Sequence, residues 1–253
     1  MAFIQVGDWS AACDDRLFEL AAQCSGAERF RVAAPAATPH LSLSWVEPSP
    51  ADHWTQLDGE TGQPGSYRIE GNQLLACIPP ESAAAEAALR ALFHIATLRQ
   101  GGVLLHASAA RFGSGSIVAL GPSGAGKSTL ARFCVEAGGE LLSDETVAFY
   151  PDGRVFGTPF FSDDDLVGAP RVARAQRIVW LEKGESECLE QLPRAKAVAM
   201  LLSQAYRPAP GEATFEVLLD RAARLAEAAD LHRFVFRKHP DSGQFLKRSL
   251  LAA

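Results

Sequence analysis

A glycine-rich stretch in the middle of the chain has the residue types and spacing that hold a nucleoside triphosphate. Residues 121–129 read GPSGAGKST and fit the pattern G-x-x-x-x-G-K-[S/T]. Glycines let successive backbone N–H groups point inward at phosphate oxygens, and a helix starting at the lysine places its positive end behind them. The pattern therefore predicts an ATP and Mg²⁺ site. Its expected members are Gly121, Ser123, Gly124, Ala125, Gly126, Lys127, Ser128 and Thr129.

Two of these side chains have distinct expected roles. Lys127 can reach the β- and γ-phosphates, and the Ser128 hydroxyl can ligate Mg²⁺. The apolar run Ile117–Leu120 predicts a strand that feeds the loop, and a helix is expected from Lys127 to Ala137. A glycine-rich turn that binds nothing would rarely carry both flanking elements.

A pair of acidic residues follows the loop at a short distance. Asp144 comes 17 residues (144 − 127) after Lys127, at the end of the strand-like stretch Leu141–Ser143, and Glu145 is next. One helix and one strand bring such acids back to the phosphate-bearing edge of a sheet. Asp144 could then accept the proton of a substrate hydroxyl or hold Mg²⁺, and Glu145 could ligate the metal.

Other elements must position these groups. Val103–Arg111 predicts a strand, residues 112–115 a tight turn, and Ser116–Leu120 the returning strand, which places His106 on a hairpin beside the loop. Arg177, at the start of a strong strand, is a weaker candidate for stabilising charge on a transferring phosphoryl group. Residues 163–165 are three aspartates, which suit either a second metal ligand or an exposed acidic loop.

Composition narrows the class of protein. The 253 residues carry a net charge of −6, with 47% hydrophobic and 21% charged residues, as in ordinary globular proteins. The charge gives no sign of a nucleic-acid or anionic membrane surface, and no apolar run reaches the length of a membrane span. The acidic N-terminus lacks the features of a secretory signal, and five scattered cysteines suit a reducing cytoplasm. We expect a cytoplasmic protein of two parts, a β-rich segment 1–80 and an α/β phosphate-loop domain 81–253.

Two familiar nucleotide-binding classes fit poorly. The loop letters resemble those of ABC-transporter ATPases, but the chain lacks a signature like Leu-Ser-Gly-Gly-Gln, and Asp144 arrives too soon after the loop. A Ras-like GTPase would carry an N-K-x-D guanine motif, which the sequence also lacks.

The order of these motifs resembles the catalytic domain of HPr kinase/phosphorylase. The matching elements are Leu-Leu-His106-Ala-Ser, the glycine-rich hairpin, the phosphate loop, Leu-Leu-Ser-Asp144-Glu145 and the block at Gly157–Phe160. The likeness is greater still to HPr-kinase-like serine kinases, including those of lasso-peptide clusters, and it covers roughly residues 82–205. It implies an α/β fold of the HPr kinase/PEP carboxykinase-like type.

The resemblance also implies an activity and roles for residues. These are ATP- and Mg²⁺-dependent transfer of the γ-phosphoryl group to a serine-type hydroxyl of a peptide or protein, with Asp144 as general base, and with His106 near the phosphates. Glu145 stands where the family commonly has a second aspartate, and a glycine-rich signature tied to the phosphorylase reaction is missing. Two alternatives stay open, a small-molecule kinase and a non-catalytic ATP-dependent adaptor. Homo-oligomer formation, known in the family, is a further possibility.

Overall fold

The structure is a computed structural model that describes residues 1–35, 37–47, 54–57, 65–162, 166–207 and 211–251. The chain forms two compact units, Met1–Gln100 and Gly101–Ala253. The sequence predicted a boundary after residue 80. The division falls later because helix α2 (Ser82–Arg99) packs on α1 (Asp15–Ala22) and β3 (Leu41–Trp45) of the first unit. No helix in the described part of the chain is long and apolar enough to cross a membrane.

The first unit is built on a six-stranded mixed sheet, as the β-rich prediction required. Its strand order is β1-β2-β3-β6-β5-β4. Besides β3, the strands of this sheet are β1 Ala2–Val6, β2 Trp9–Cys13, β4 Thr55–Gln56, β5 Ser66–Glu70 and β6 Gln73–Cys77. A short 3₁₀ helix spans Ala27–Phe30. The 3₁₀ helix ends at Phe30, which is buried.

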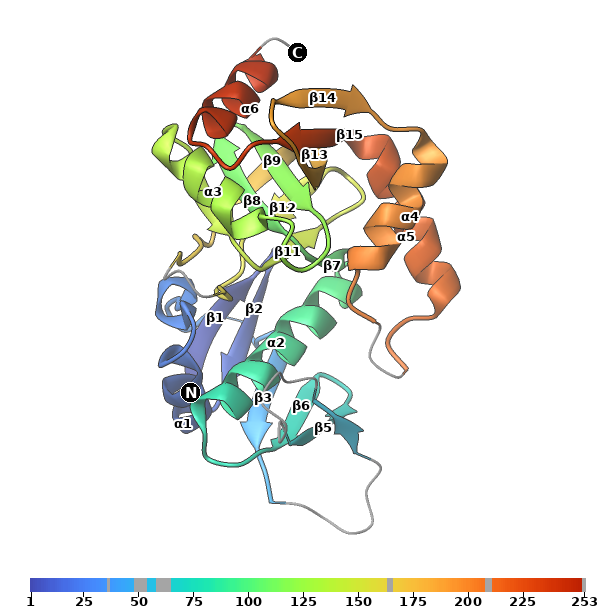
Figure 1. Cartoon of the computed structure of the whole chain (residues 1–253). Helices are drawn as coiled ribbons and strands as arrows, with labels where there is room; N and C mark the ends of the chain where they lie inside the picture. The colour runs from blue at the N-terminus through green and yellow to red at the C-terminus, as the bar shows by residue number, and fades with distance from the viewer. Residues whose placement is uncertain (36, 48–53, 58–64, 163–165, 208–210, 252–253) are drawn as a thin grey trace. The chain divides into compact units, whose positions relative to one another are not determined.

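The second unit is a nine-stranded sheet with helices on both faces (Figure 1). The main strand order is β10-β8-β9-β13-β12-β11-β7, and β15 pairs with both β13 and β14. The strands are β7 Val103–His106, β8 Ser108–Phe112, β9 Gly115–Leu120, β10 Glu140–Ser143, β11 Thr146–Phe149, β12 Arg154–Phe156, β13 Val172–Lys183, β14 Cys188–Gln191 and β15 Asp230–Phe236. The helices are α3 Lys127–Glu136, α4 Arg194–Gln204, α5 Phe215–Ala228 and α6 Asp241–Leu251.

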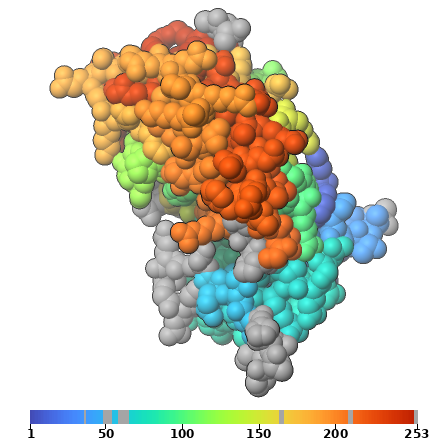
Figure 2. Space-filling view, turned by 90° about the vertical axis from the view of Figure 1, so that its right-hand side faces the viewer, coloured from blue at the N-terminus to red at the C-terminus, as the bar shows by residue number. Residues whose placement is uncertain are grey.

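Alternation along the central strands explains the two helical layers. In β9, Val118 and Leu120 belong to a hydrophobic core that includes residues of α4 and α5, whereas Ile117 and Ala119 belong to one that includes residues of α3 and α6. Successive strand residues point to opposite faces, so a continuous apolar run fills both cores. Figure 2 looks onto the side of this unit that α4 and α5 form.

Strand direction gathers several chain segments at one edge of this sheet. β9 and β13 are parallel, as are β13 and β15. β10 is antiparallel to β8, which is antiparallel to β9, so β10 runs in the same direction as β9. The carboxyl ends of β9, β10, β13 and β15 therefore point to a common edge, the place where α/β sheets bind ligands.

The predicted strand Val103–Arg111 is two strands. β8 pairs with β9 as the expected hairpin, from Ser108 opposite Ala119 to Phe112 opposite Gly115. β7 instead leaves that pairing and lies at the far edge, beside β11. No Gly or Pro stands at His106-Ala107-Ser108, so the sequence carries no turn signal that marks the break at Ala107.

Candidate active site

The segment Gly121–Gly126, called here the glycine loop, joins β9 to α3 at the common edge. Gly124 and Gly126 have φ values of 75° and 103°, in the region that favours glycine. The Ala125 N–H donates to the Pro122 oxygen at 3.1 Å and closes the turn. The helix then starts directly at Lys127, so unpaired N–H groups of its first turn point toward the loop.

Lys127 is held inside the loop. Its ammonium donates to the Gly121 oxygen at 2.9 Å and to the Pro122 oxygen at 3.3 Å, and the residue is 7% exposed. Burial lowers the pKa of Lys127, and the nearby Glu145 carboxylate opposes that shift. Ser108 of β8 donates to the Lys127 oxygen at 3.0 Å, which fixes the start of α3 on the sheet.

Asp144 lies at the same edge and makes several hydrogen bonds. The residue is 1% exposed. Ser162 donates its backbone N–H to Oδ1 at 3.1 Å and its hydroxyl to Oδ2 at 3.0 Å. The Ser162 hydroxyl also lies 2.9 Å from that of Ser128, so Asp144 is linked to the first turn of α3. Burial raises the pKa of Asp144, and hydrogen bonds from Ser162 and Ser128 oppose the rise. A carboxylate with a raised pKa is the stronger proton acceptor.

A buried hydroxyl network supports the turn that carries Asp144. The Thr158 hydroxyl lies 3.1 Å from that of Ser143 and 2.7 Å from that of Thr146, and Ser143 also donates to the Phe160 oxygen at 3.3 Å. Phe160 is fully buried. The network therefore fixes residues 158–160 against the end of β10 and places Ser162 next to Asp144.

His106 comes to the acidic turn by a different route from the predicted one. It is the last residue of β7 and pairs with Thr146 of β11, and the following Ala107 N–H donates to the Glu145 oxygen at 2.9 Å. The β7–β11 pairing, rather than the β8–β9 hairpin, thus places His106 beside Glu145. Because β8 begins at Ser108, the same segment also contacts the start of α3.

The donor set fits a magnesium ion. Ser128 offers a hydroxyl, and Asp144 and Glu145 offer carboxylates, all of them hard oxygen donors. Within the described residues no group of three or more His, Cys, Asp or Glu side chains forms a metal cage. Mg²⁺ bound with nucleotides usually takes one or two carboxylates and completes its octahedron with phosphate oxygens and water, so two acids suffice. Residues 163–165, considered as a second ligand source, lie outside the described residues.

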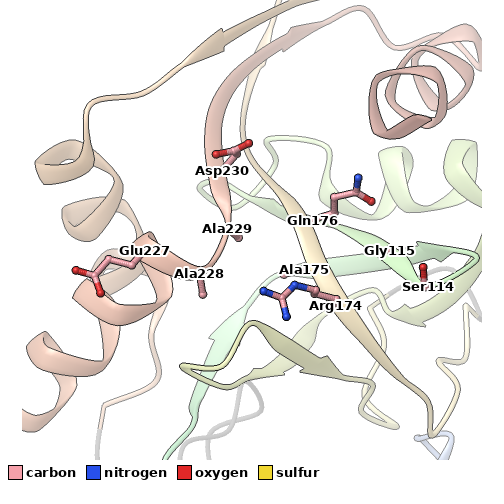
Figure 3. A pocket seen from close by; sticks show the side chains of 9 residues that line it. All are labelled: Ser114, Gly115, Arg174, Ala175, Gln176, Glu227, Ala228, Ala229 and Asp230. Atoms are coloured by element: carbon pink, nitrogen blue, oxygen red, sulfur yellow. The ribbon is translucent and has the colours of Figure 1, made fainter. Parts of the chain in front are cut away.

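The arginines lie elsewhere. Arg177 of β13 pairs with Ile117 of β9, three residues before Leu120, the last residue ahead of the glycine loop. Burial lowers the pKa of Arg177. Arg174 lines a cavity of about 490 Å³ with Gln176 and Asp230 (Figure 3). Since Gly115 at the start of β9 also lines it, this cavity lies at the opposite end of the strand from the glycine loop.

Comparisons with known proteins do not assign this chain to a family. No family model matches the chain, and no curated protein matches it. Among solved structures, the chain is similar to the Hpr(Ser) kinase/phosphatase from Coxiella burnetii at 13% sequence identity, with 59% of this chain and 88% of that chain covered. The TM-score is 0.29, too low for an argument about fold or function. The chain is a mixed α/β protein, and its site geometry carries the proposals below.

The structure brings four of the predicted site residues to the same edge of the sheet, together with one further residue that no sequence motif indicated. Lys127, Ser128, Asp144 and Glu145 are joined there by the contacts described above. Ser162 is the addition. It lies 18 residues from Asp144, and no spacing rule connects the two. The Gly157–Phe160 block before it and the aspartates 163–165 after it drew attention to this region, but neither indicated Ser162 itself.

A pair of glycine substitutions tests whether the glycine loop depends on close packing. Gly124→Ala and Gly126→Ala should each cost roughly 1–2 kcal/mol, because both residues have positive φ. A Cβ on Gly126 would also lie 2.8 Å from Phe236, which is buried and stacked on Phe234, whereas one on Gly124 meets no atom within 4 Å. We expect Gly126→Ala to lower the thermal midpoint further than Gly124→Ala does. Equal midpoints would show that Phe236 moves aside freely.

Proposed function

We propose that this protein is an ATP- and Mg²⁺-dependent kinase that transfers the γ-phosphoryl group to a serine-type hydroxyl of a peptide or protein. The observation that supports this most directly is the placement of Asp144. A buried carboxylate already accepts a hydrogen bond from a serine hydroxyl at 3.0 Å, and that serine lies 2.9 Å from the hydroxyl of Ser128 behind the glycine loop. These contacts support the assignment of a phosphate cradle and a base for a hydroxyl to one edge of the sheet.

The roles of the residues follow from this arrangement. The backbone N–H groups of the glycine loop and the Lys127 ammonium bind the β- and γ-phosphates, and Ser128 and Glu145 hold the metal. Mg²⁺, when bound, neutralises charge on the phosphates. Asp144 orients the acceptor hydroxyl and takes its proton. His106, next to the turn that carries Asp144 and Glu145, hydrogen-bonds a phosphate or orients these two carboxylates. Such transfer depends mostly on positioning and electrostatics, and the hydrogen bonds that hold Lys127 and Asp144 support such positioning here.

The decisive experiment combines binding with transfer. Purified protein is titrated with ATP in the presence and absence of Mg²⁺ by calorimetry, and then incubated with [γ-³²P]ATP and a set of serine-containing peptides. Metal-dependent ATP binding with label on peptide serine supports the proposal. Label on small hydroxylated metabolites alone would make the protein a small-molecule kinase. ATP binding that drives association with a partner, without transfer to any acceptor, would make it an adaptor and overturn the proposal.

A further inference from the structure

The side chain of Ser162 meets the requirements of a phosphoryl acceptor within its own chain. It is an exposed residue at the end of an anchored segment, and its hydroxyl hydrogen-bonds the Asp144 carboxylate, the base of the proposed function. Its other hydroxyl contact is Ser128, in the first turn of the helix that follows the glycine loop. No sequence motif pointed to this residue.

The hydrogen bonds of Ser162 show where its hydroxyl proton is directed. A serine hydroxyl carries one proton and two lone pairs. The Ser162 proton is donated to Asp144 Oδ2, and the Ser128 hydroxyl, which also hydrogen-bonds Asp144, lies 2.9 Å from Ser162 Oγ. The Ser162 hydroxyl therefore directs its proton at the carboxylate while its oxygen keeps a lone pair, which is the arrangement an attacking hydroxyl needs.

Ser162 is also fixed at two points on Asp144, rather than merely near it. Its backbone N–H reaches Oδ1 at 3.1 Å while its hydroxyl reaches Oδ2 at 3.0 Å. Behind it, Phe160 is fully buried and its oxygen accepts from Ser143, and Thr158 is buried among hydroxyls of the same turn. A serine held this way has already lost the conformational freedom that a bound peptide would have to lose.

From this geometry we propose that Ser162 is an autophosphorylation site of this protein. The inference rests on the proposed kinase function. Ser162 Oγ forms a bond to the γ-phosphorus of ATP as the bond from that phosphorus to the β–γ bridging oxygen breaks. ADP leaves with the bonding electrons, and the hydroxyl proton passes to the Asp144 carboxylate. The product is a phosphoserine beside the glycine loop, and once Asp144 has released the proton to solvent, the two anions repel each other and favour a phosphoryl group turned away from Asp144.

The test is self-labelling without any added acceptor. The protein is incubated with [γ-³²P]ATP and Mg²⁺ at several protein concentrations, and the label is mapped by proteolysis and mass spectrometry. We expect one phosphoryl group on Ser162, at a rate independent of protein concentration. Ser162→Ala should lose the label, and Ser162→Thr should keep it. Ser203→Ala, at an exposed serine of α4, is the matched control and should label like the unaltered protein.

The outcomes separate this inference from the proposed function. If serine peptides are phosphorylated but the protein acquires no label, or labels equally in the Ser162→Ala variant, the inference is overturned and the kinase function stands. In that case, faster peptide phosphorylation by Ser162→Ala would show that Ser162 only blocks the acceptor position. If neither peptide nor protein is labelled although ATP binds, both are overturned.

Discussion

Replacing Lys127 with methionine should abolish phosphoryl transfer while leaving the protein folded. The ammonium is the main positive side chain inside the glycine loop, 2.9 Å from the Gly121 oxygen, and methionine keeps its length without its charge. Removing one preorganised charge from a phosphoryl-transfer site costs roughly 10²–10³-fold in rate, and ATP affinity should fall as well. The measurements are the transfer rate with a serine peptide, or with the protein itself, and the ATP dissociation constant by calorimetry.

Stability need not follow activity in this variant. The substitution leaves the Gly121 and Pro122 oxygens without their donor, at a cost of roughly 1–3 kcal/mol, but it also removes the penalty of burying a charge. The same burial lowers the pKa of Lys127. Lys196→Met, at an exposed lysine of α4, is the control and should change neither property. Unaltered ATP affinity in Lys127→Met would contradict the assignment of the glycine loop to phosphate binding.

Replacing Asp144 with asparagine should separate binding from chemistry. Asparagine has nearly the same shape and can still accept a hydrogen bond from the Ser162 N–H, but its amide cannot take a proton from an acceptor hydroxyl. Loss of a general base lowers the rate by roughly 10²–10⁴-fold. We expect that loss in the transfer assay, together with an ATP dissociation constant that changes only a few-fold and a nearly unchanged thermal midpoint.

The control for this variant is Asp220→Asn, at an exposed aspartate that pairs with Arg224 on α5. It should transfer phosphoryl groups normally. If Asp144→Asn transfers at the normal rate, Asp144 is not the base, and His106 or Glu145 becomes the next residue to replace. If ATP affinity collapses along with the rate, Asp144 holds the metal rather than the proton.

Local patterns in the sequence were sufficient for the elements around the glycine loop. The apolar run before Gly121, the lysine that starts α3, and the glycines that end this helix each act on their immediate neighbours, so the strand–loop–helix unit follows from short-range sterics and hydrogen bonding. The return of Asp144 to the same edge also followed, because β10 comes directly after α3 and runs in the same direction as β9.

Long-range pairing decided the rest. Nothing in the residues around Ala107 shows that the chain leaves β8 and places β7 beside β11, since that choice depends on which strand offers a free edge and which face each side chain covers. The same pairing, and not the expected hairpin, sets His106 opposite Thr146 and brings the next residue, Ala107, to the Glu145 oxygen. Likewise, the sequence placed α2 with the second unit, and tertiary contacts show that it packs on α1 and β3 of the first.

The sequence by itself determined which groups could do chemistry, namely a glycine loop with Lys127 and Ser128 and an acid one helix later, because these depend on residue type and short spacing. Only the tertiary structure decided what Asp144 contacts. The hydroxyl network at Thr158 and the buried Phe160 bring Ser162 to the Asp144 carboxylate, although the two residues are 18 positions apart in the chain. Tertiary packing makes this contact, and no local sequence pattern encodes it.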